Sequence, residues 1–327
     1  MSHWVIPTLV LTAGAGLLLW GAEEFMEHIA ALARAWRLPV IAMGLLLAGA
    51  EPEEMVTALI ASGTGNPVLA ATDALGANVT MTALGLGLAL VATSGAGTWA
   101  AGGAAQVSTL RGYAVAAAGC GVLALLALYD GYLGRGEALA LVTAYVALVA
   151  FIWRTQRRPP AFGELAENDD EDDDDHDVEK SSGRTLLMVA LGLAAMVTGG
   201  ALAVRGAAGL AERSGLGQQA TGLTALAFAT SIEVLALVAA GRRRQLTAVA
   251  VGGVLGSVIY NATLTLGLAA VVAPLTTPDL RWVAIIATVL PLALLSRFAL
   301  SRPRPVGVGL LAAYAAYLVA ALRTGVS

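Results

Sequence analysis

Three glutamates, Glu51, Glu53 and Glu54, stand inside an apolar stretch, 38–65, that otherwise has the composition of a membrane span. One charged side chain at the centre of a bilayer costs about 2.5 to 3.5 kcal/mol on insertion scales, so three carboxylates this close together call for a bound ligand. Pro52 removes a backbone donor among them, and a kinked or broken helix there would expose carbonyl oxygens beside the carboxylates. Hard cations such as Ca²⁺ prefer such an oxygen cage, which makes this stretch a candidate cation site.

Further polar residues lie mid-way along other apolar runs. Three readings compete with a role as cation ligands: the asparagines would join helices, the hydroxyls would bond to their own helices, and Asp73 would be a helix-start carboxylate. The candidate cation ligands are Glu51, Glu53, Glu54, Thr57, Asn78, Thr230, Ser231, Glu233, Ser257 and Asn261, and Asp73 is a candidate residue of the ion pathway.

The composition predicts an all-α polytopic membrane protein. Only 13% of the 327 residues are charged and 57% are hydrophobic, whereas a soluble domain carries about 25% charge. The sequence has no HExxH, no G-x-S-x-G and no nucleotide-binding loop, so we expect neither an enzyme nor a cofactor nor a nucleic-acid partner.

Charge-free runs and Gly/Pro breaks predict about ten transmembrane helices. Their expected ranges are 5–28, 38–63, 67–93, 107–128, 136–155, 185–211, 216–241, 245–273, 280–297 and 305–323.

The basic residues predict the orientation, since Lys and Arg collect on the cytoplasmic side. With both termini outside, 14 of the 19 basic residues lie inside and 5 lie outside. The inner set is Arg34, Arg37, Arg111, Arg154, Arg157, Arg158, Lys180, Arg184, Arg242, Arg243, Arg244, Arg297, Arg302 and Arg304. We therefore expect a cell-membrane protein with the N- and C-termini outside.

Two halves of the chain repeat one pattern. Gly76 is followed eleven residues later by Gly87, and Gly256 is followed at the same spacing by Gly267. Equivalent helices are five spans apart, an odd number, so the copies have opposite topology, as in secondary transporters. The sequence predicts two inverted five-helix repeats, in residues 1–158 and 185–327.

The segment 159–184 between the halves is strongly acidic. Residues 164–179 hold eleven of the 23 acids, and they repel one another too strongly to fold alone. We expect a disordered cytoplasmic linker. A low-affinity Ca²⁺ sensor is the alternative, although the segment lacks the fixed ligand spacing of an EF-hand loop.

The second half resembles the cation/calcium exchanger superfamily, whose repeats each carry G-[TS]-S-x-P-E followed by a G-S-N-x-x-[ND] helix. Thr230, Ser231 and Glu233 match the Thr, Ser and Glu, although the Pro is absent and the spacing is one residue short. Ser257 matches the Ser of the following helix, and Asn261 stands where the family has Asn or Asp.

The first half departs further from the family pattern. Gly49 and Asn78 match, and Glu54 takes the place of the cation-binding glutamate, but Glu51 and Glu53 replace a neutral residue and the proline. The resemblance implies that Glu54 and Glu233 are the paired metal ligands, one from each repeat.

The resemblance also implies a secondary active cation antiporter, which we expect to exchange Ca²⁺ for Na⁺ or H⁺. A monovalent Na⁺(K⁺)/H⁺ antiporter and a transport-inactive membrane scaffold or sensor remain alternatives, the latter because the first repeat departs from the pattern. The expected partners are inorganic cations and the lipid bilayer, while the oligomeric state stays open.

Overall fold

The computed structural model describes residues 4–35, 51–92, 103–156, 178–232, 234–235, 238, 247–277, 279–296, 299 and 302–324. The helical elements of these residues group into ten segments. The first five are α1 (Val5–Ala35), α3 (Pro52–Gly63), the continuous helix α4 (Pro67–Val79), η1 (Thr80–Gly85) and α5 (Leu86–Ala92), α6 (Gly103–Ala127) and α7 (Arg135–Gln156). The second five are α8 (Val178–Ser214), the continuous helix α9 (Gly217–Thr221), η3 (Gly222–Leu226) and α10 (Ala227–Thr230), the continuous helix α12 (Thr247–Tyr260), η4 (Asn261–Thr265) and α13 (Leu266–Val272), then α14 (Arg281–Val289) with η5 (Leu290–Leu295), and α16 (Pro303–Thr324).

The predicted all-α membrane architecture is confirmed. Six of these helices are long and apolar enough to cross a membrane, and 5–21 and 281–295 form shorter apolar helices. Two helix ends differ most from the prediction. α1 continues to Ala35, beyond the expected end near residue 28, and α8 begins at Val178 rather than near residue 185. A helix can extend beyond the membrane because its backbone hydrogen bonds are internal. Hydropathy therefore predicts where the apolar part ends but not where the helix ends.

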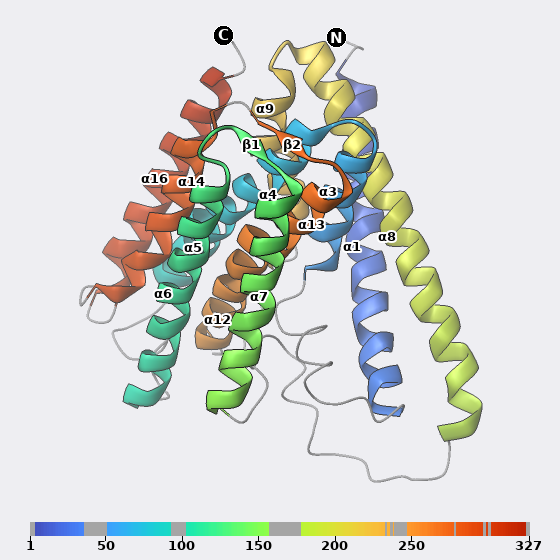
Figure 1. Cartoon of the computed structure of the whole chain (residues 1–327), viewed down its shortest axis with the longest axis horizontal. Coiled ribbons are helices and arrows are strands. Elements are labelled where there is room, and N and C mark those ends of the chain that lie inside the picture. Colours follow the sequence, from blue (N-terminus) through green and yellow to red (C-terminus); the bar gives the residue numbers. More distant parts are fainter. Residues whose placement is uncertain are drawn as a thin grey trace.

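The continuous helices α4–α5 and α12–α13 form the centre of the bundle. In each, 83% of the most apolar part is buried, against 22% in α7 and in α16. Figure 1 shows α1 and α8 side by side along one flank and α14 and α16 along the opposite flank. The outer helices carry the exposed apolar side chains that a lipid-facing surface requires, such as Leu126, Phe151 and Val308.

The contacts between helices are exchanged between the two halves, as inverted repeats require. α7 packs on α13, and its equivalent α16 packs on α5; α6 packs on α12, and its equivalent α14 packs on α4. Gly87 and Gly267 occupy matching places in these pairs. A Cβ at Gly87 would lie 3.3 Å from the Gly307 oxygen of α16, and one at Gly267 would lie 2.9 Å from the Ala138 oxygen of α7.

The first helices of the two repeats, α1 and α8, make the most extensive helix pair in the described part of the chain. Small residues let their backbones approach closely, the usual means of helix association in lipid. A Cβ at Gly14 would lie 2.5 Å from the Ala203 nitrogen, and one at Gly199 would lie 2.5 Å from the Leu18 nitrogen.

Two short strands join the halves at one end of the bundle. β1 (Tyr132–Leu133) pairs antiparallel with β2 (Leu275–Thr276), with Tyr132 opposite Thr276. α1 begins and α16 ends at this same end, whereas α7 ends and α8 begins at the other (Figure 1). The alternation of helix directions therefore agrees with ten crossings.

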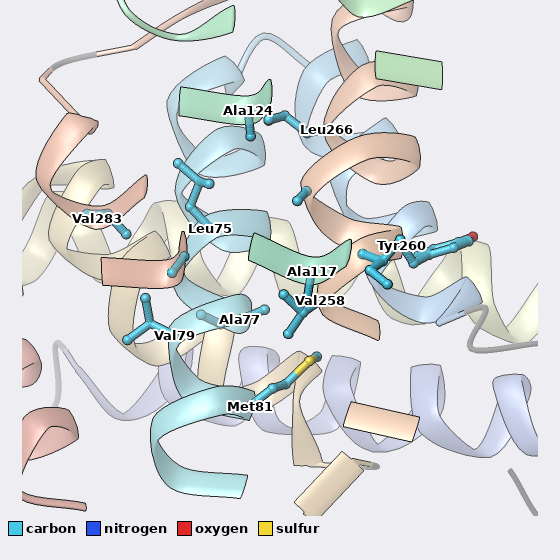
Figure 2. Close-up of a cluster of buried hydrophobic side chains, with 14 of the residues drawn as sticks. Leu75, Ala77, Val79, Met81, Ala117, Ala124, Val258, Tyr260, Leu266 and Val283 are labelled. Carbon is cyan, nitrogen blue, oxygen red and sulfur yellow. The ribbon is translucent and has the colours of Figure 1, made fainter. Parts of the chain in front are cut away.

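A continuous apolar cluster surrounds the central helices (Figure 2). Its labelled members come from α4 and η1, from α6, from α12 to α13, and from α14: Leu75, Ala77, Val79, Met81, Ala117, Ala124, Val258, Tyr260, Leu266 and Val283. The polar side chains described next interrupt this cluster.

Candidate functional site

The three glutamates lie at the start of a helix in the interior of the bundle. α3 begins at Pro52, and Glu51 just before it has non-helical backbone angles (φ −101°, ψ 82°). Proline suits the first helical position because the amide hydrogen it lacks has no partner there. The side chains of Glu51, Glu53 and Glu54 are 6%, 0% and 1% exposed. A helix N-terminus carries partial positive charge, which lowers the cost of holding carboxylates in this place.

Asn261 reaches these carboxylates from the second repeat. Its Nδ2 donates hydrogen bonds to Glu54 Oε2 and, at 3.4 Å, to Glu51 Oε2. The Thr265 hydroxyl donates to Asn261 Oδ1 at 3.0 Å, which turns the amide nitrogen toward the glutamates. Asn261 opens the π-helical turn η4, and such turns inside α-helices are frequent at functional sites. The structure thus brings together three of the predicted ligands, and they come from both repeats.

Asn78 lies near the axis that relates the repeats. Its Nδ2 donates to the Val258 oxygen at 3.3 Å. Asn78 follows Gly76 by two residues, as Val258 follows Gly256, so each is the equivalent of the other. The π-helical turn η1 begins at Thr80 in the same helix, which repeats the plan of η4. Asn78 joins two helices, as the alternative reading expected, but its Oδ1 remains buried without a hydrogen bond in the described structure.

The second repeat places Thr230 and Ser231 at the end of α10. The helix stops at Ser231, whose hydroxyl donates to the Ala227 oxygen at 2.6 Å. The Thr230 hydroxyl lies 3.2 Å from Asp73 Oδ1 in the first repeat. Glu233, the predicted partner of Glu54, lies outside the described residues, as do Gly49 and most of the acidic linker, 159–177.

Several buried oxygens of the site have no hydrogen bond in the described structure. They are Glu54 Oε1, Thr57 Oγ1 and Asn78 Oδ1. Buried polar atoms are almost always paired in folded proteins, so a group of exceptions needs an explanation. These acceptors are the atoms that a bound cation would satisfy. Ser257 differs, because its hydroxyl bonds to the Gly253 oxygen of its own helix at 3.2 Å.

Two features of the site were missed from the sequence. Thr265, which orients Asn261, follows it by four residues, a spacing that places two helical side chains on one face. Tyr260 lies beside the glutamates, donates to the Met55 sulfur at 3.3 Å and meets the Tyr145 ring edge-on, with 5.6 Å between ring centroids. Its apolar ring gave no signal in the sequence, since an aromatic residue in a span is usually packing.

The arrangement is suited to holding a desolvated cation between two repeats. Among the described residues, no three His, Cys, Asp or Glu side chains converge as a metal site by themselves. The glutamates, the amide oxygen of Asn78 and the Thr57 hydroxyl instead offer a mixed set of oxygens from α3 and α4, and the Asn261 amide nitrogen reaches the glutamates from η4.

Comparison with known proteins gives concordant matches. The sequence model described as "Sodium/calcium exchanger protein" matches residues 6–154 and 184–323. The chain is 27% identical over 274 residues to the inner membrane protein YrbG of Escherichia coli, covering 83% of this chain and 81% of that protein. It is 26% identical over 273 residues to the putative antiporter CaxA of Alkalimonas amylolytica, covering 83% and 82%.

Solved structures show the same fold. The sodium-calcium exchanger NCX_Mj, soaked with 10 mM Na⁺ and zero Ca²⁺, superposes with a TM-score of 0.58 at 19% identity, covering 97% of this chain and 99% of that one. The same exchanger soaked with 2.5 mM Na⁺ and 0.1 mM Ca²⁺ gives a TM-score of 0.56. The architecture of ten helices in inverted repeats is therefore shared with a known exchanger.

Proposed function

Because this chain belongs to the sodium/calcium exchanger protein family, we propose that it is a secondary active antiporter that exchanges Ca²⁺ for Na⁺ or H⁺ across the cell membrane. The observation that carries the proposal is the contact of Asn261 with Glu54 and Glu51. It joins carboxylates and an amide from opposite repeats in the interior of the bundle, where a transporter of this plan binds its ion.

Ca²⁺ fits the oxygens of the site. Calcium takes six to eight oxygen ligands from carboxylates, carbonyls and amides in flexible geometry. Glu54 and Glu233 would supply one charged ligand from each repeat, and Glu51, Glu53, Thr57 and Asn78 would complete the cage. Asn261 would hold Glu51 and Glu54 in place through its amide nitrogen. Thr230, Ser231 and Ser257 remain weaker ligand candidates, since each hydroxyl also bonds to a carbonyl of its own helix.

A cation site between the two repeats supports a role in transport rather than cation binding alone. Glu54 belongs to α3, and Asn261 belongs to the helix that packs against it from the other half. A relative movement of the two halves would open such a site first to one side of the membrane and then to the other. The charge of a bare cluster of carboxylates opposes that movement, and a bound cation or protons would neutralise it.

Ion flux in proteoliposomes tests the proposal. The purified chain is reconstituted with Ca²⁺ inside, and Ca²⁺ release is measured while an inward gradient of Na⁺, K⁺ or H⁺ is imposed in turn. We expect release driven by Na⁺ or H⁺ and absent without a counter-ion. Flux of Na⁺ or K⁺ against H⁺ with no Ca²⁺ movement would replace this function with monovalent exchange, and no flux at all would point to a scaffold or sensor.

A further inference from the structure

One basic side chain packs between two helices rather than extending into water. Arg111 is half-buried in α6, and the apolar part of this helix starts at the residue before it. An arginine at the end of a span usually extends its charged group to the interface. The Arg111 side chain instead reaches the neighbouring helix, where its Nη2 lies 3.4 Å from the Leu295 oxygen at the end of η5. Its position therefore needs an explanation beyond that of an ordinary interfacial charge.

The guanidinium group of Arg111 has more donors than acceptors around it. An arginine carries five N–H groups, and within the described ranges the hydrogen bond of this side chain goes to the Leu295 oxygen. Its Nε is buried without a hydrogen bond to any described residue. The ion pairs of the described residues involve His28 and Arg281, so no carboxylate among these residues balances Arg111. The helix-end carbonyl accounts for part of the hydrogen bonding and leaves the positive charge without an anion.

Arg111 lies toward one end of the bundle. α6 leads to β1 and α14 follows β2, so the start of α6 and the end of η5 both lie away from the strands (Figure 1). The distribution of basic residues predicts that this end faces the cytoplasm. Arg302 is exposed at the same end, just before α16. Basic side chains at such a surface meet the anionic headgroups of the inner leaflet.

The surface beside Arg111 is apolar and exposed. Val115 follows Arg111 by one turn on the same face of α6 and is 55% exposed, and Leu292 in the neighbouring η5 is 37% exposed. α6 and α14 are in close contact, since a Cβ at Gly121 would lie 3.0 Å from the Thr288 Cα. The two helices therefore offer one continuous surface to lipid, with a guanidinium group at its inner end.

We propose that Arg111, between α6 and η5, binds the headgroup phosphate of an anionic phospholipid of the inner leaflet. A phosphodiester carries a negative charge and acceptor oxygens, which match the unbalanced charge and the unused N–H groups of this guanidinium. A lipid fits better than a free phosphate, because the exposed side chains of Val115 and Leu292 continue the site into the bilayer. The lipid site lies on the outside of the bundle and does not depend on which cations the chain exchanges.

Three variants of the full-length chain test the lipid site. Arg111→Gln removes the charge and keeps a donor for the Leu295 oxygen. Val115→Trp leaves Arg111 in place and fills the lipid-facing surface beside it. Arg302→Gln is the matched control, because it removes an exposed arginine from the same end of the bundle. Each purified protein is titrated with phosphatidylglycerol and with phosphatidylcholine. Native mass spectrometry counts the bound lipids, and thermal unfolding of the same mixtures gives a second readout.

We expect the wild type to bind a single phosphatidylglycerol more tightly than phosphatidylcholine, and to unfold at a higher temperature in its presence. Arg111→Gln should raise the apparent dissociation constant for phosphatidylglycerol about tenfold, the effect of losing a hydrogen bond to a charged group. Val115→Trp should show a similar loss, and Arg302→Gln should bind like the wild type. If Arg111→Gln does not fold, the wild type and Val115→Trp decide the question.

Equal affinity of the wild type for the two lipids would overturn the proposal, as would unchanged phosphatidylglycerol affinity in Arg111→Gln or in Val115→Trp. An equal loss in Arg302→Gln would show a general attraction by basic charge instead of a defined site. Inorganic phosphate that stabilised the wild type as much as phosphatidylglycerol does would replace the lipid with a free anion. A wild type that binds the lipid but exchanges no cation would refute the proposed function alone.

Discussion

Single residues of the site depend on one another for their orientation. Asn261 donates to two glutamates because Thr265 occupies its oxygen. Without that bond the amide could turn and present its oxygen to the carboxylates, which would repel it. The chemistry of the site therefore depends on a hydroxyl that need not touch the ion.

Replacing Thr265 by Val should weaken Ca²⁺ binding about two- to tenfold, the value of one ordinary hydrogen bond. The Asn261 amide would lose the bond that fixes it, while the volume of the side chain hardly changes. Calorimetric Ca²⁺ titration of the purified protein measures the effect. Thr263→Val is the matched control, because Thr263 is equally buried but its hydroxyl bonds to the Ile259 oxygen of its own helix. Equal affinities of the two variants would contradict the orienting role.

Replacing Glu54 by Gln should abolish cation-dependent flux without preventing membrane insertion. The change removes the charge that we assign to the ion and leaves the side chain nearly the same size. Since an uncharged side chain is cheaper to bury in lipid, the variant should insert at least as well. Flux in proteoliposomes and the yield in the membrane fraction check the two parts. Glu233→Gln should behave alike, and wild-type flux in both variants would refute the paired-ligand assignment.

At the scale of elements, the long pair α1 and α8 stands at one flank of the bundle and is held by close backbone approach. Gly14 and Gly199 face the partner helix, where a Cβ would lie 2.5 Å from a backbone nitrogen. In lipid, packing of this kind replaces the hydrophobic force that joins helices in water. An added methyl group at the contact between α1 and α8 should therefore lower the stability of the protein clearly, whereas one elsewhere on these helices should change it little.

Replacing Gly14 by Ala should lower the stability of the protein by about 1 to 3 kcal/mol, the usual cost of overpacking. The added methyl group would force the two helices apart along their contact. Thermal unfolding in detergent, followed by intrinsic fluorescence, measures the loss as a lower midpoint. Gly16→Ala is the control, because a Cβ at Gly16 meets nothing within 4 Å. An unchanged midpoint in Gly14→Ala would show that the helices can separate without cost.

At the scale of the whole molecule, the two halves are joined mainly by exchanged contacts between helices, and one short pair of strands, β1 and β2, links them at one end. Each central helix packs on the peripheral helices of the other half. α1 begins and α16 ends on the β1–β2 side of the bundle (Figure 1). Residues 1–158 and 185–327 therefore remain our proposed halves, with an acidic linker between them.

Labelling of single cysteines should show that the β1–β2 end faces outside. The 14-to-5 distribution of basic residues motivates this orientation. In a background without Cys120, the single cysteine, Tyr132→Cys should react with an impermeant maleimide added to intact cells. Arg302→Cys should react only after lysis; both side chains are exposed in the structure. The opposite pattern would invert the proposed topology.

The order and spacing of the residues were enough to establish the class of the protein and the pairing of its halves. An apolar run that crosses a bilayer must bond its own backbone polar groups, and an α-helix does so. Once the runs are taken as helices, the Gly and Pro breaks between them locate most helix ends. Gly76 and Gly256 lie in equivalent helices five spans apart, and this odd number gives the two copies opposite directions, because direction depends on the number of crossings alone. Glu51, Glu53 and Glu54 were identified as a candidate site because charged side chains in a membrane span are costly and usually bind an ion or a partner.

Which polar groups meet became clear from the packing of the helices. Asn261 and Glu54 are more than two hundred residues apart, and the sequence could nominate both but could not join them. By sequence alone Asp73 was a candidate helix-start carboxylate. In the structure α4 begins at Pro67, six residues earlier, and the Asp73 carboxylate accepts a hydrogen bond from Thr230 of the other repeat. Hydropathy and spacing are properties of one helix, whereas a binding site in lipid is made where the faces of several helices converge, and that convergence depends on packing.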